Sequence, residues 1–398
     1  MFQIDFKSRR SVRDQIVDNF KHLINTGLLQ PMEEVPDIEE ISVGLVINPN
    51  TCQKAYAELE KQGYFYFNID SGWIVVDQNA RRQMSSLSNA YASHANIKPR
   101  NHEYYVIAEN LTKYLGDSLV LNELNIDIKK GSIYGLMGVN GSGKTTLIKH
   151  LAKIYQSDYG EIFVEQTPIN QVSQLSIGYL PDETSFLPNY TMRKMSSFFE
   201  SKHKKNWDYE RYQDLLEKFD LNEEQKLDTF SSGMKKQAAL IFALSAMPDF
   251  LLLDETLDGL DPIVRHYVAR EIIKDVAERQ MTVFVTSHNI NELDGICDTI
   301  GIIDKGHIIV ERDVDDLRSN IHKINVAFSP GSITGNPYAG LNLLFKEDLG
   351  GTDLIVVHGQ ESSIASAIKR HKPILYNHMP MTLEEIFIYE KAEGNPEE

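Results

Sequence analysis

The chain contains little cysteine and no long apolar segment. Its two cysteines, Cys52 and Cys297, lie far apart without the spacing of metal ligands, which suits a reducing cytosol and not a disulfide framework. No apolar run approaches the roughly 18 to 20 residues that a membrane helix needs. The segment from Met1 to Asp5 lacks the basic and then apolar pattern of a signal peptide. We therefore expect a cytoplasmic protein, or one held peripherally at the inner face of the cell membrane.

Basic residues are also in deficit. The 40 Lys and Arg residues against 57 Asp and Glu residues give a formal net charge of −17. Such a charge supports solubility and argues against wholesale coating of nucleic acid, so any DNA contact must come from a local basic face. The length of 398 residues predicts two or three domains.

The most informative motif that is present is a phosphate-binding loop. The pattern G-x-x-x-x-G-K-[ST] lies between an apolar strand, Ile133 to Met137, and the start of a helix. Its backbone N–H groups and the helix N-terminus favour a triphosphate, the lysine reaches the β- and γ-phosphates, and the hydroxyl after it binds Mg²⁺. The predicted nucleotide contacts here are Gly138, Asn140, Gly141, Ser142, Gly143, Lys144, Thr145 and Thr146. We therefore expect ATP and Mg²⁺ as cofactors.

A second motif supplies carboxylates. The apolar run from Phe250 to Leu253 ends in Asp254 and Glu255, and a buried parallel strand delivers such groups to the rim of its sheet. Asp254 is predicted to hold Mg²⁺ through water, and Glu255 to orient or deprotonate the attacking water. Alone this motif is weak, because strands commonly end in solvated acids. About a hundred residues after a phosphate loop, it is strong.

Over roughly residues 104–317 the chain resembles the ATPase subunits of ATP-binding cassette (ABC) transporters. The resemblance implies an adenine-stacking aromatic, a signature loop that caps the ATP of a partner subunit, a loop that contacts that subunit, and a switch histidine. The matching residues are Tyr114, then Ser231 and Gly233, then Asp261, and finally His288. It also implies a homodimer, in which Lys144, Glu255 and His288 act in catalysis.

Several residues depart from the family pattern. Asp182 stands where the family usually has Gln, at a position that senses the γ-phosphate and links the site to the membrane partner. An acid there could still coordinate Mg²⁺, but it adds negative charge near the triphosphate. Ser232 and Met234 alter the signature loop, and Thr256 replaces a Pro. None of these changes removes a catalytic group, so hydrolysis is expected.

The remaining patterns predict the domain organisation. Helical stripes occur at residues 12–25, after Asp37, which is placed as an N-cap, and after Asn48, and a hairpin around Gly72 follows. Together they indicate a winged helix-turn-helix over residues 1–77. Residues 78–102 are predicted to be a linker with at most one helix. A central α/β P-loop ABC ATPase domain with a helical subdomain is expected over residues 103–320, and a small C-terminal α/β accessory domain over residues 321–398.

The first 77 residues resemble the winged helix of GntR-type repressors, closest to the YtrA-like group. The predicted base contacts are Asn50, Thr51, Gln53 and Lys54, and the predicted phosphate contacts are Arg9, Arg10 and Arg13. Residues 1–77 contain seven basic and twelve acidic residues, which gives a net charge of −5. Glu39 and Glu40 lie at positions that are often Arg in the family, and Val46 lies at the position of the turn glycine. We expect weak or dimer-dependent DNA binding. The alternative is a winged helix kept for dimerisation or protein contact.

Two functions stay open on these grounds. The first, favoured because the two modules are fused, is a transcription regulator whose affinity for double-stranded operator DNA follows ATP-driven dimerisation. The second is the motor subunit of an exporter with a separate membrane permease, which would dock near residues 182–200. Phe186 and Tyr190 in that segment are equally good candidates for the core. The ending from Pro380 to Phe387 resembles the tails of bacitracin-export-type subunits.

Overall fold

A computed structural model describes residues 2–6, 8, 10–68, 71–77, 104–172, 175–204, 206–329, 331 and 335–394. The predicted linker at 78–102 lies outside the described residues. The chain divides into two compact units, considered separately below: one comprises residues 1–35, 51–78 and 312–398, and the other residues 36–50 and 79–311. None of the described helices combines the length and the apolar character that crossing a membrane would require.

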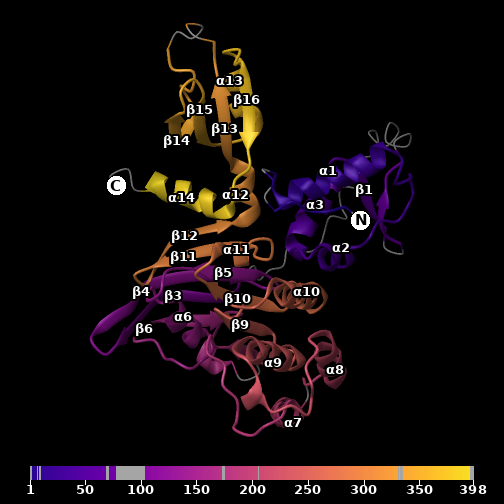
Figure 1. Ribbon diagram of the computed structural model, residues 1–398, viewed down its shortest axis with the longest axis vertical. Helices are drawn as coiled ribbons and strands as arrows, with labels where there is room; N and C mark the ends of the chain where they lie inside the picture. Colours follow the sequence, from indigo (N-terminus) through magenta and orange to yellow (C-terminus); the bar gives the residue numbers. More distant parts are fainter. Residues whose placement is uncertain are drawn as a thin grey trace. The chain divides into compact units, whose positions relative to one another are not determined.

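A six-stranded sheet forms the centre of the second unit (Figure 1). Its order is β12 (His307–Asp313), β11 (Thr299–Asp304), β5 (Ile133–Met137), β10 (Thr282–Ser287), β9 (Phe250–Asp254) and β8 (Ile177–Leu180). The strands from β11 to β8 run parallel. Every residue of β9 and β10 is buried, as expected for parallel strands covered on both faces. Their carboxyl ends therefore meet at one edge, where the predicted site residues follow.

An antiparallel sheet completes this core. Its order is β4 (Ser118–Lys129), β3 (Tyr104–Leu115), β6 (Tyr159–Val164) and β7 (Thr167–Pro168), and a short 3-10 helix, η1 (Ile169–Gln171), follows. Leu111 and Leu121 from this sheet share one apolar cluster with Leu136 and Leu252 of the parallel sheet. The two sheets are thus a single packed body, which fixes the position of the phosphate loop.

The second unit also contains helices, some of which pack together as a helical subdomain. They are α2 (Ile38–Leu45), α6 (Lys144–Leu151), α7 (Met192–His203), α8 (Tyr209–Lys218), η2 (Leu227–Thr229), α9 (Ser232–Ser245), α10 (Pro262–Arg279) and α11 (Ile290–Leu293). Aromatic rings join α7, α8 and α9, with Phe199 stacked on Phe242 at 5.0 Å between ring centroids. Phe186 packs edge-on against the same Phe242 at 5.8 Å, so of its two expected roles the structure supports the one in the core.

The N-terminal elements occur in the predicted order. They are α1 (Val12–Asn25), α2, α3 (Pro49–Lys61), β1 (Phe65–Asn68) and β2 (Gly72–Val75). Asp37 caps α2 as predicted, accepting from the Glu40 N–H. In the first unit, rings of α1, α3 and the hairpin pack edge-to-face, with 5.6 Å between Phe20 and Tyr56 and 5.4 Å between Tyr56 and Trp73. The predicted apolar stripes therefore form a core here.

The C-terminal part of the first unit is an antiparallel sheet with helices. Its elements are α12 (Val314–Asn320), β13 (Ile321–Ala327), β14 (Asn342–Asp348), β15 (Asp353–His358), α13 (Glu361–Lys369), β16 (Leu375–Met379) and α14 (Leu383–Gly394), and its strand order is β14-β15-β13-β16. Ile364 and Ile368 of α13 pack on Ile324 and Ile355 of the sheet. Apolar patterns in the sequence predict strands at residues 323–328 and 354–357 and helices at residues 364–368 and 383–389, which correspond to β13, β15, α13 and α14. They do not predict β14 and β16.

Candidate active site

The phosphate loop connects β5 to α6 and depends on its glycines. Gly141 and Gly143 have φ values of 81° and 113°, in the left-handed region that L side chains avoid. A Cβ on Gly138 would lie 2.5 Å from the Ser142 hydroxyl, and one on Gly143 would lie 3.0 Å from the Val120 carbonyl oxygen. No bulkier residue fits these positions. The loop therefore keeps its backbone close to the N-terminus of α6, as phosphate binding requires.

Lys144 is buried within this loop. Its ammonium donates to the carbonyl oxygens of Gly138, at 2.7 Å, and Val139, at 3.3 Å. It also forms an ion pair of 3.0 Å with a carboxylate oxygen of Glu255. A low-dielectric setting strengthens each of these contacts. The predicted phosphate ligand and the predicted catalytic acid are thus brought together, as the sequence analysis expected.

Asp254, at the end of β9, is 2% exposed and faces α6. Its carboxylate accepts from the hydroxyls of Thr286, at 2.8 Å, and Thr145, at 3.4 Å. Burial raises the pKa of Asp254, while those two hydrogen bonds lower it and the nearby Glu255 and Asp182 carboxylates raise it further. Thr145 and Asp254 thus present an oxygen-only ligand set, which fits the preference of Mg²⁺.

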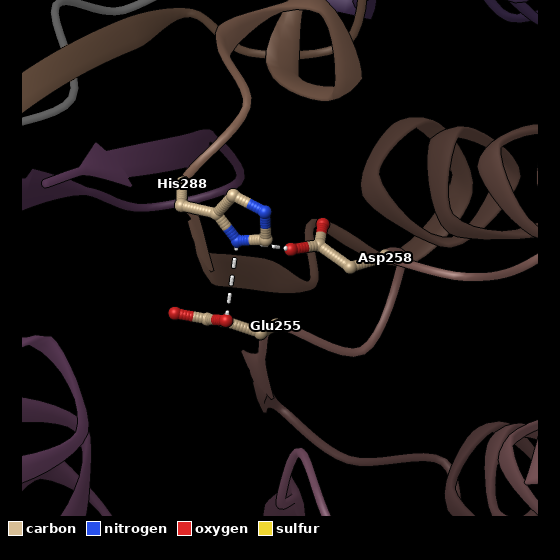
Figure 2. Close-up of side chains that lie close together, drawn as sticks. All are labelled: Glu255, Asp258 and His288. Carbon is tan, nitrogen blue, oxygen red and sulfur yellow. Dashed lines mark hydrogen bonds and ion pairs between the residues drawn. The ribbon is translucent and has the colours of Figure 1, made fainter. Parts of the chain in front are cut away.

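Glu255, Asp258 and His288 meet beside this set (Figure 2). The His288 Nδ1 lies 2.8 Å from the Asp258 carboxylate and 3.3 Å from the Glu255 carboxylate. Burial is the largest influence on Glu255 and opposes its ionisation, but Lys144 and then His288 together hold its pKa below the ordinary value. Glu255 is therefore a carboxylate at neutral pH, as a group that orients or deprotonates water must be. The three side chains offer ligand atoms that lie close enough together to hold a metal ion.

Asp182 does not join the oxygen set by direct contact. Its carboxylate is 56% exposed and pairs with Lys236 of α9 at 3.2 Å. Its charge nevertheless makes a small contribution, after burial and Glu255, to raising the pKa of Asp254. Asp182 therefore adds the negative charge that the sequence predicted. The Lys236 ammonium, which the sequence did not indicate, lies against this charge.

The residues expected to face a partner subunit lie at two helix N-termini. Ser231 caps α9 by accepting from the Met234 N–H at 3.3 Å, and Gly233 in its first turn has open space where a side chain would be. Asp261 caps α10, accepting from two backbone N–H groups. Both caps are at the surface, where the positive ends of helices can meet an anion. Their role across a dimer stays a prediction.

Tyr114 lies near the end of β3 with 43% of its surface exposed. Its N–H donates to the Asp158 carboxylate at 2.7 Å, and Lys113 pairs with the same acid at 3.2 Å. Those contacts fix the backbone while the ring stays accessible. An exposed ring on a fixed strand is suited to stacking on a base.

Sequence reasoning missed several residues of the site. Thr286 bonds both Asp254 and the Glu255 N–H, Asp258 holds His288, and Lys236 reaches the turn after β9. Asp258 and Thr286 adjoin recognised motifs, which was the available signal. Lys236 lies in the polar run Lys235-Lys236-Gln237 after the signature loop, where the sequence does not distinguish it from its neighbours.

The residues predicted to read DNA are engaged within the chain. Asn50 donates to Asp298 and to the Gly131 carbonyl oxygen, each at 3.0 Å. Thr51 is buried, not exposed as expected, and donates to Asp315 at 3.0 Å, while Lys54 pairs with Asp313 at 2.8 Å and also with Asp315. The physical reason is that donors at the start of α3 find carboxylates of their own chain.

The predicted phosphate contacts show a similar pattern. Arg10 pairs with Asp18, and Arg13 pairs with Asp14 and donates to Ser319, each at 3.3 Å. Gln53 is half-buried on α3, and Arg9 lies outside the described residues. The excess of acidic over basic residues in this segment is therefore reflected in the structure, where basic side chains that were expected to contact DNA pair with acidic side chains.

The chain is similar in sequence to several known proteins. The family described as "ABC transporter" matches residues 121–258. The ABC transporter ATP-binding protein YtrB of Bacillus subtilis is 30% identical over 70% of this chain and 95% of its own length. The linearmycin resistance ATP-binding protein LnrL of the same species is 30% identical over 67% of this chain and 87% of its own length. The bacitracin transport ATP-binding protein BcrA of Bacillus licheniformis is 35% identical over 54% of this chain and 71% of its own length.

These matches cover the phosphate loop and the strand that carries Asp254 and Glu255, but the family match does not include the first 77 residues. The winged-helix and GntR resemblance of that segment, and the accessory domain at the C-terminus, therefore stay predictions. The ATPase is a different matter, because its motifs, its geometry and its relatives agree. The chain belongs to the ABC transporter ATP-binding protein family and is an ABC-type ATPase.

Proposed function

We propose that the chain is the ATP-hydrolysing motor subunit of an exporter that works with a separate membrane permease. On the sequence alone this function ranks second to a DNA-binding regulator, and the relatives favour it over that regulator. Relatives named for bacitracin transport and linearmycin resistance support it. One observation supports ATP hydrolysis most directly: Lys144, Asp254 and Glu255 lie together in the site. Lys144 pairs with Glu255, and the neighbouring Asp254 accepts from the Thr145 and Thr286 hydroxyls.

Each residue has a distinct task in this proposal. The Lys144 ammonium leaves Glu255 for the phosphate oxygens when ATP enters, and the released carboxylate turns to the attacking water. His288, held by Asp258, stays beside it to contact the γ-phosphate. Thr145 and Asp254 would hold Mg²⁺, which when bound neutralises phosphate charge.

We further propose that two copies of the chain form the active species. Ser231, Gly233 and Asp261 lie at surface helix N-termini, whose backbone N–H groups and partial charge suit the γ-phosphate of an ATP held by the other copy. An isologous pair would use both sites at once. The permease would meet the segment around Leu187, an exposed apolar side chain that follows the half-buried Phe186.

The test of the motor function is made in the source cells. Replacing the chromosomal gene by one that encodes Lys144→Ala should raise sensitivity to an exported compound, with bacitracin and linearmycin the first two assayed. Lys149→Ala, a change on the same helix outside the site, is the matched control. Unchanged sensitivity across a broad antibiotic panel, with the variant protein present at normal levels, would contradict the export function.

A second candidate is a regulator that binds operator DNA. The specific observation in its favour is the order of α1, α2, α3 and the β1–β2 hairpin, that of a winged helix. DNA would have to replace the partners of Asn50 and Lys54, which are carboxylates of the same chain. Binding is therefore expected only in a state in which these contacts open.

Binding of the protein to its own upstream DNA, at fixed salt with and without Mg-ATP, tests this candidate. The Glu255→Gln variant should hold the ATP state, and Lys54→Ala should weaken any binding made by α3. Specific binding that changes with ATP would add regulation to the motor. Absence of specific binding in both states would leave the N-terminal segment as a dimerisation or docking module.

A further inference from the structure

Lys236 makes contacts that the family motifs do not explain. It lies in the second turn of α9 and is 9% exposed. Its ammonium donates to the carbonyl oxygens of Glu255 and Asp258, each at 3.0 Å, and to the Asp182 carboxylate at 3.2 Å. An ammonium has three N–H donors, and three acceptors surround this one. The side chain therefore connects the helix after the signature loop, the turn after β9 and the segment after β8.

The Glu255 backbone needs such support. Its φ is 47°, a left-handed conformation that residues with a side chain rarely adopt. Its N–H donates to the Thr286 carbonyl oxygen at 3.2 Å and is also within 3.1 Å of the Thr286 hydroxyl, while its carbonyl oxygen accepts from Lys236. Backbone polar groups on both sides of the Glu255 Cα are thus fixed. Without Lys236 the turn could relax, and the carboxylate would move with it.

Asp182 gives Lys236 a second task. The Lys236 ammonium joins the Asp182 carboxylate to the turn that carries Glu255, so a triphosphate bound to the phosphate loop would meet this negative charge. Lys236 supplies the opposite charge directly against it. A glutamine at position 182, as the family resemblance expects, would need no such partner. The acid at 182 and the lysine at 236 therefore fit together as a pair.

We propose that Lys236 is a positioning residue for ATP hydrolysis, which holds the backbone of Glu255 and neutralises Asp182. The proposal rests on the proposed catalytic role of Glu255. The two tasks are separable, because the backbone contacts govern the rate of the chemical step and the charge governs ATP binding. If Lys236 served only to stabilise the fold, its replacement would not change the rate of the chemical step or the affinity for ATP separately.

The experiment measures kcat and the Kd for Mg-ATP in the full-length protein. Lys236→Met should lower kcat about 10- to 100-fold, since small displacements of a catalytic group have costs of that order. It should also weaken ATP binding, because Asp182 loses its counter-ion. Lys235→Met, which removes the neighbouring charge on the same helix, should change both quantities less than about twofold, within the range of surface substitutions.

The double variant Asp182→Asn/Lys236→Met separates the two tasks. We expect it to recover the ATP Kd of the wild type but not the kcat, since the charge is balanced again while the Glu255 carbonyl still lacks its donor. Recovery of both would reduce Lys236 to a counter-ion and overturn the positioning role. If Lys236→Met does not fold, Lys236→Gln, which is neutral but keeps N–H donors, should weaken ATP binding and leave kcat largely unchanged; a loss of kcat without weaker binding would overturn the assignment of the two tasks.

The Glu255→Gln background distinguishes this proposal from the proposed function. Lys236→Met should lower the residual single-turnover rate there by less than about twofold, because residues that act through one group are not additive. An equal loss in both backgrounds would overturn the inference and leave the role of Glu255 intact. A wild-type rate in Glu255→Gln alone would overturn the catalytic assignment itself.

Discussion

The Lys144 ammonium and the Glu255 carboxylate form an ion pair of 3.0 Å at the carboxyl end of the parallel sheet. Each of the two groups is therefore the other's counter-ion until a phosphate competes for the lysine. Neither is left as an unpaired charge in a buried site, which would be costly. The pair thus keeps the site stable and leaves the lysine available to the phosphates.

The first prediction concerns this lysine. Lys144→Ala should lower hydrolysis by at least about 10²- to 10³-fold, the cost of removing a donor aimed at the developing charge. ATP binding, measured by the anisotropy of a fluorescent ATP analogue, should fall with it. Lys149→Ala on the same helix should bind normally. Binding of the analogue by Lys144→Ala with wild-type affinity would show that the loop is not the nucleotide site.

The second prediction concerns pH and Asp254. Burial raises the folded-state pKa of this group above its ordinary value of 3.8, so the folded state is favoured most below that value and loses the benefit as pH rises through the raised pKa. Asp254→Asn has no charge to bury. Its melting temperature should exceed that of the wild type at pH 7.5, by about 2–4 °C for each kcal/mol.

The difference should shrink toward pH 4.5, where the wild-type carboxyl is protonated more often. The variant should also lose ATPase activity, because Mg²⁺ loses a carboxylate ligand. Melting curves of both proteins at the two pH values check this. An unchanged difference, or a lower melting temperature for the variant at pH 7.5, would contradict the cause given for the raised pKa.

The third prediction concerns the end of α2. Val46 has φ 54° and ψ 54°, and for a β-branched residue this left-handed conformation is strained. Val46→Gly should therefore be more stable than Val46→Ala by about 1 kcal/mol, since both lose the two γ-methyl groups but only glycine lacks the Cβ that this backbone conformation disfavours. Urea unfolding of the two variants measures this. Equal stabilities would mean that the turn relaxes without cost.

The fourth prediction concerns Asp298. Its carboxylate accepts from the Asn48 and Asn50 side-chain amides, at 2.8 and 3.0 Å, and from the Ile133 N–H at 2.7 Å. Asp298→Ala would leave these donors without that acceptor, at a cost of about 1–3 kcal/mol for each one that stays buried and unsatisfied. Thermal unfolding checks the loss, with Asp316→Ala as an exposed control. An equal effect of the two would show that these donors find water instead.

Local patterns were enough to predict the elements that carry the nucleotide site. The strand Ile133–Met137 and the strand ending at Asp254 are short apolar runs next to motifs, and both occur as expected. The cap of α2 at Asp37 followed from residue chemistry alone. By contrast, β14 was missed because most of its residues are exposed and it shows no alternation of apolar and polar positions.

The contacts that sequence reasoning missed depend on distances between remote residues. Lys236 meets Asp182 and Glu255 only because α9 packs beside β8 and the turn after β9. Likewise, the sequence predicts DNA contacts for the donors at the start of α3, because it does not show that carboxylates of the same chain accept from them. A sequence motif contains only residues that are close together in the chain. The partner that neutralises a charged side chain can be remote in the sequence and is known only from the folded structure.

Single-turnover hydrolysis of labelled ATP by wild type and Glu255→Gln, with the mass of each protein in solution measured alongside, tests the central claim most directly. We predict that the wild type hydrolyses its ATP and stays largely monomeric. Glu255→Gln should retain ATP, hydrolyse it at least about 10²-fold more slowly, and accumulate as a dimer. Hydrolysis by Glu255→Gln at the wild-type rate would contradict the account.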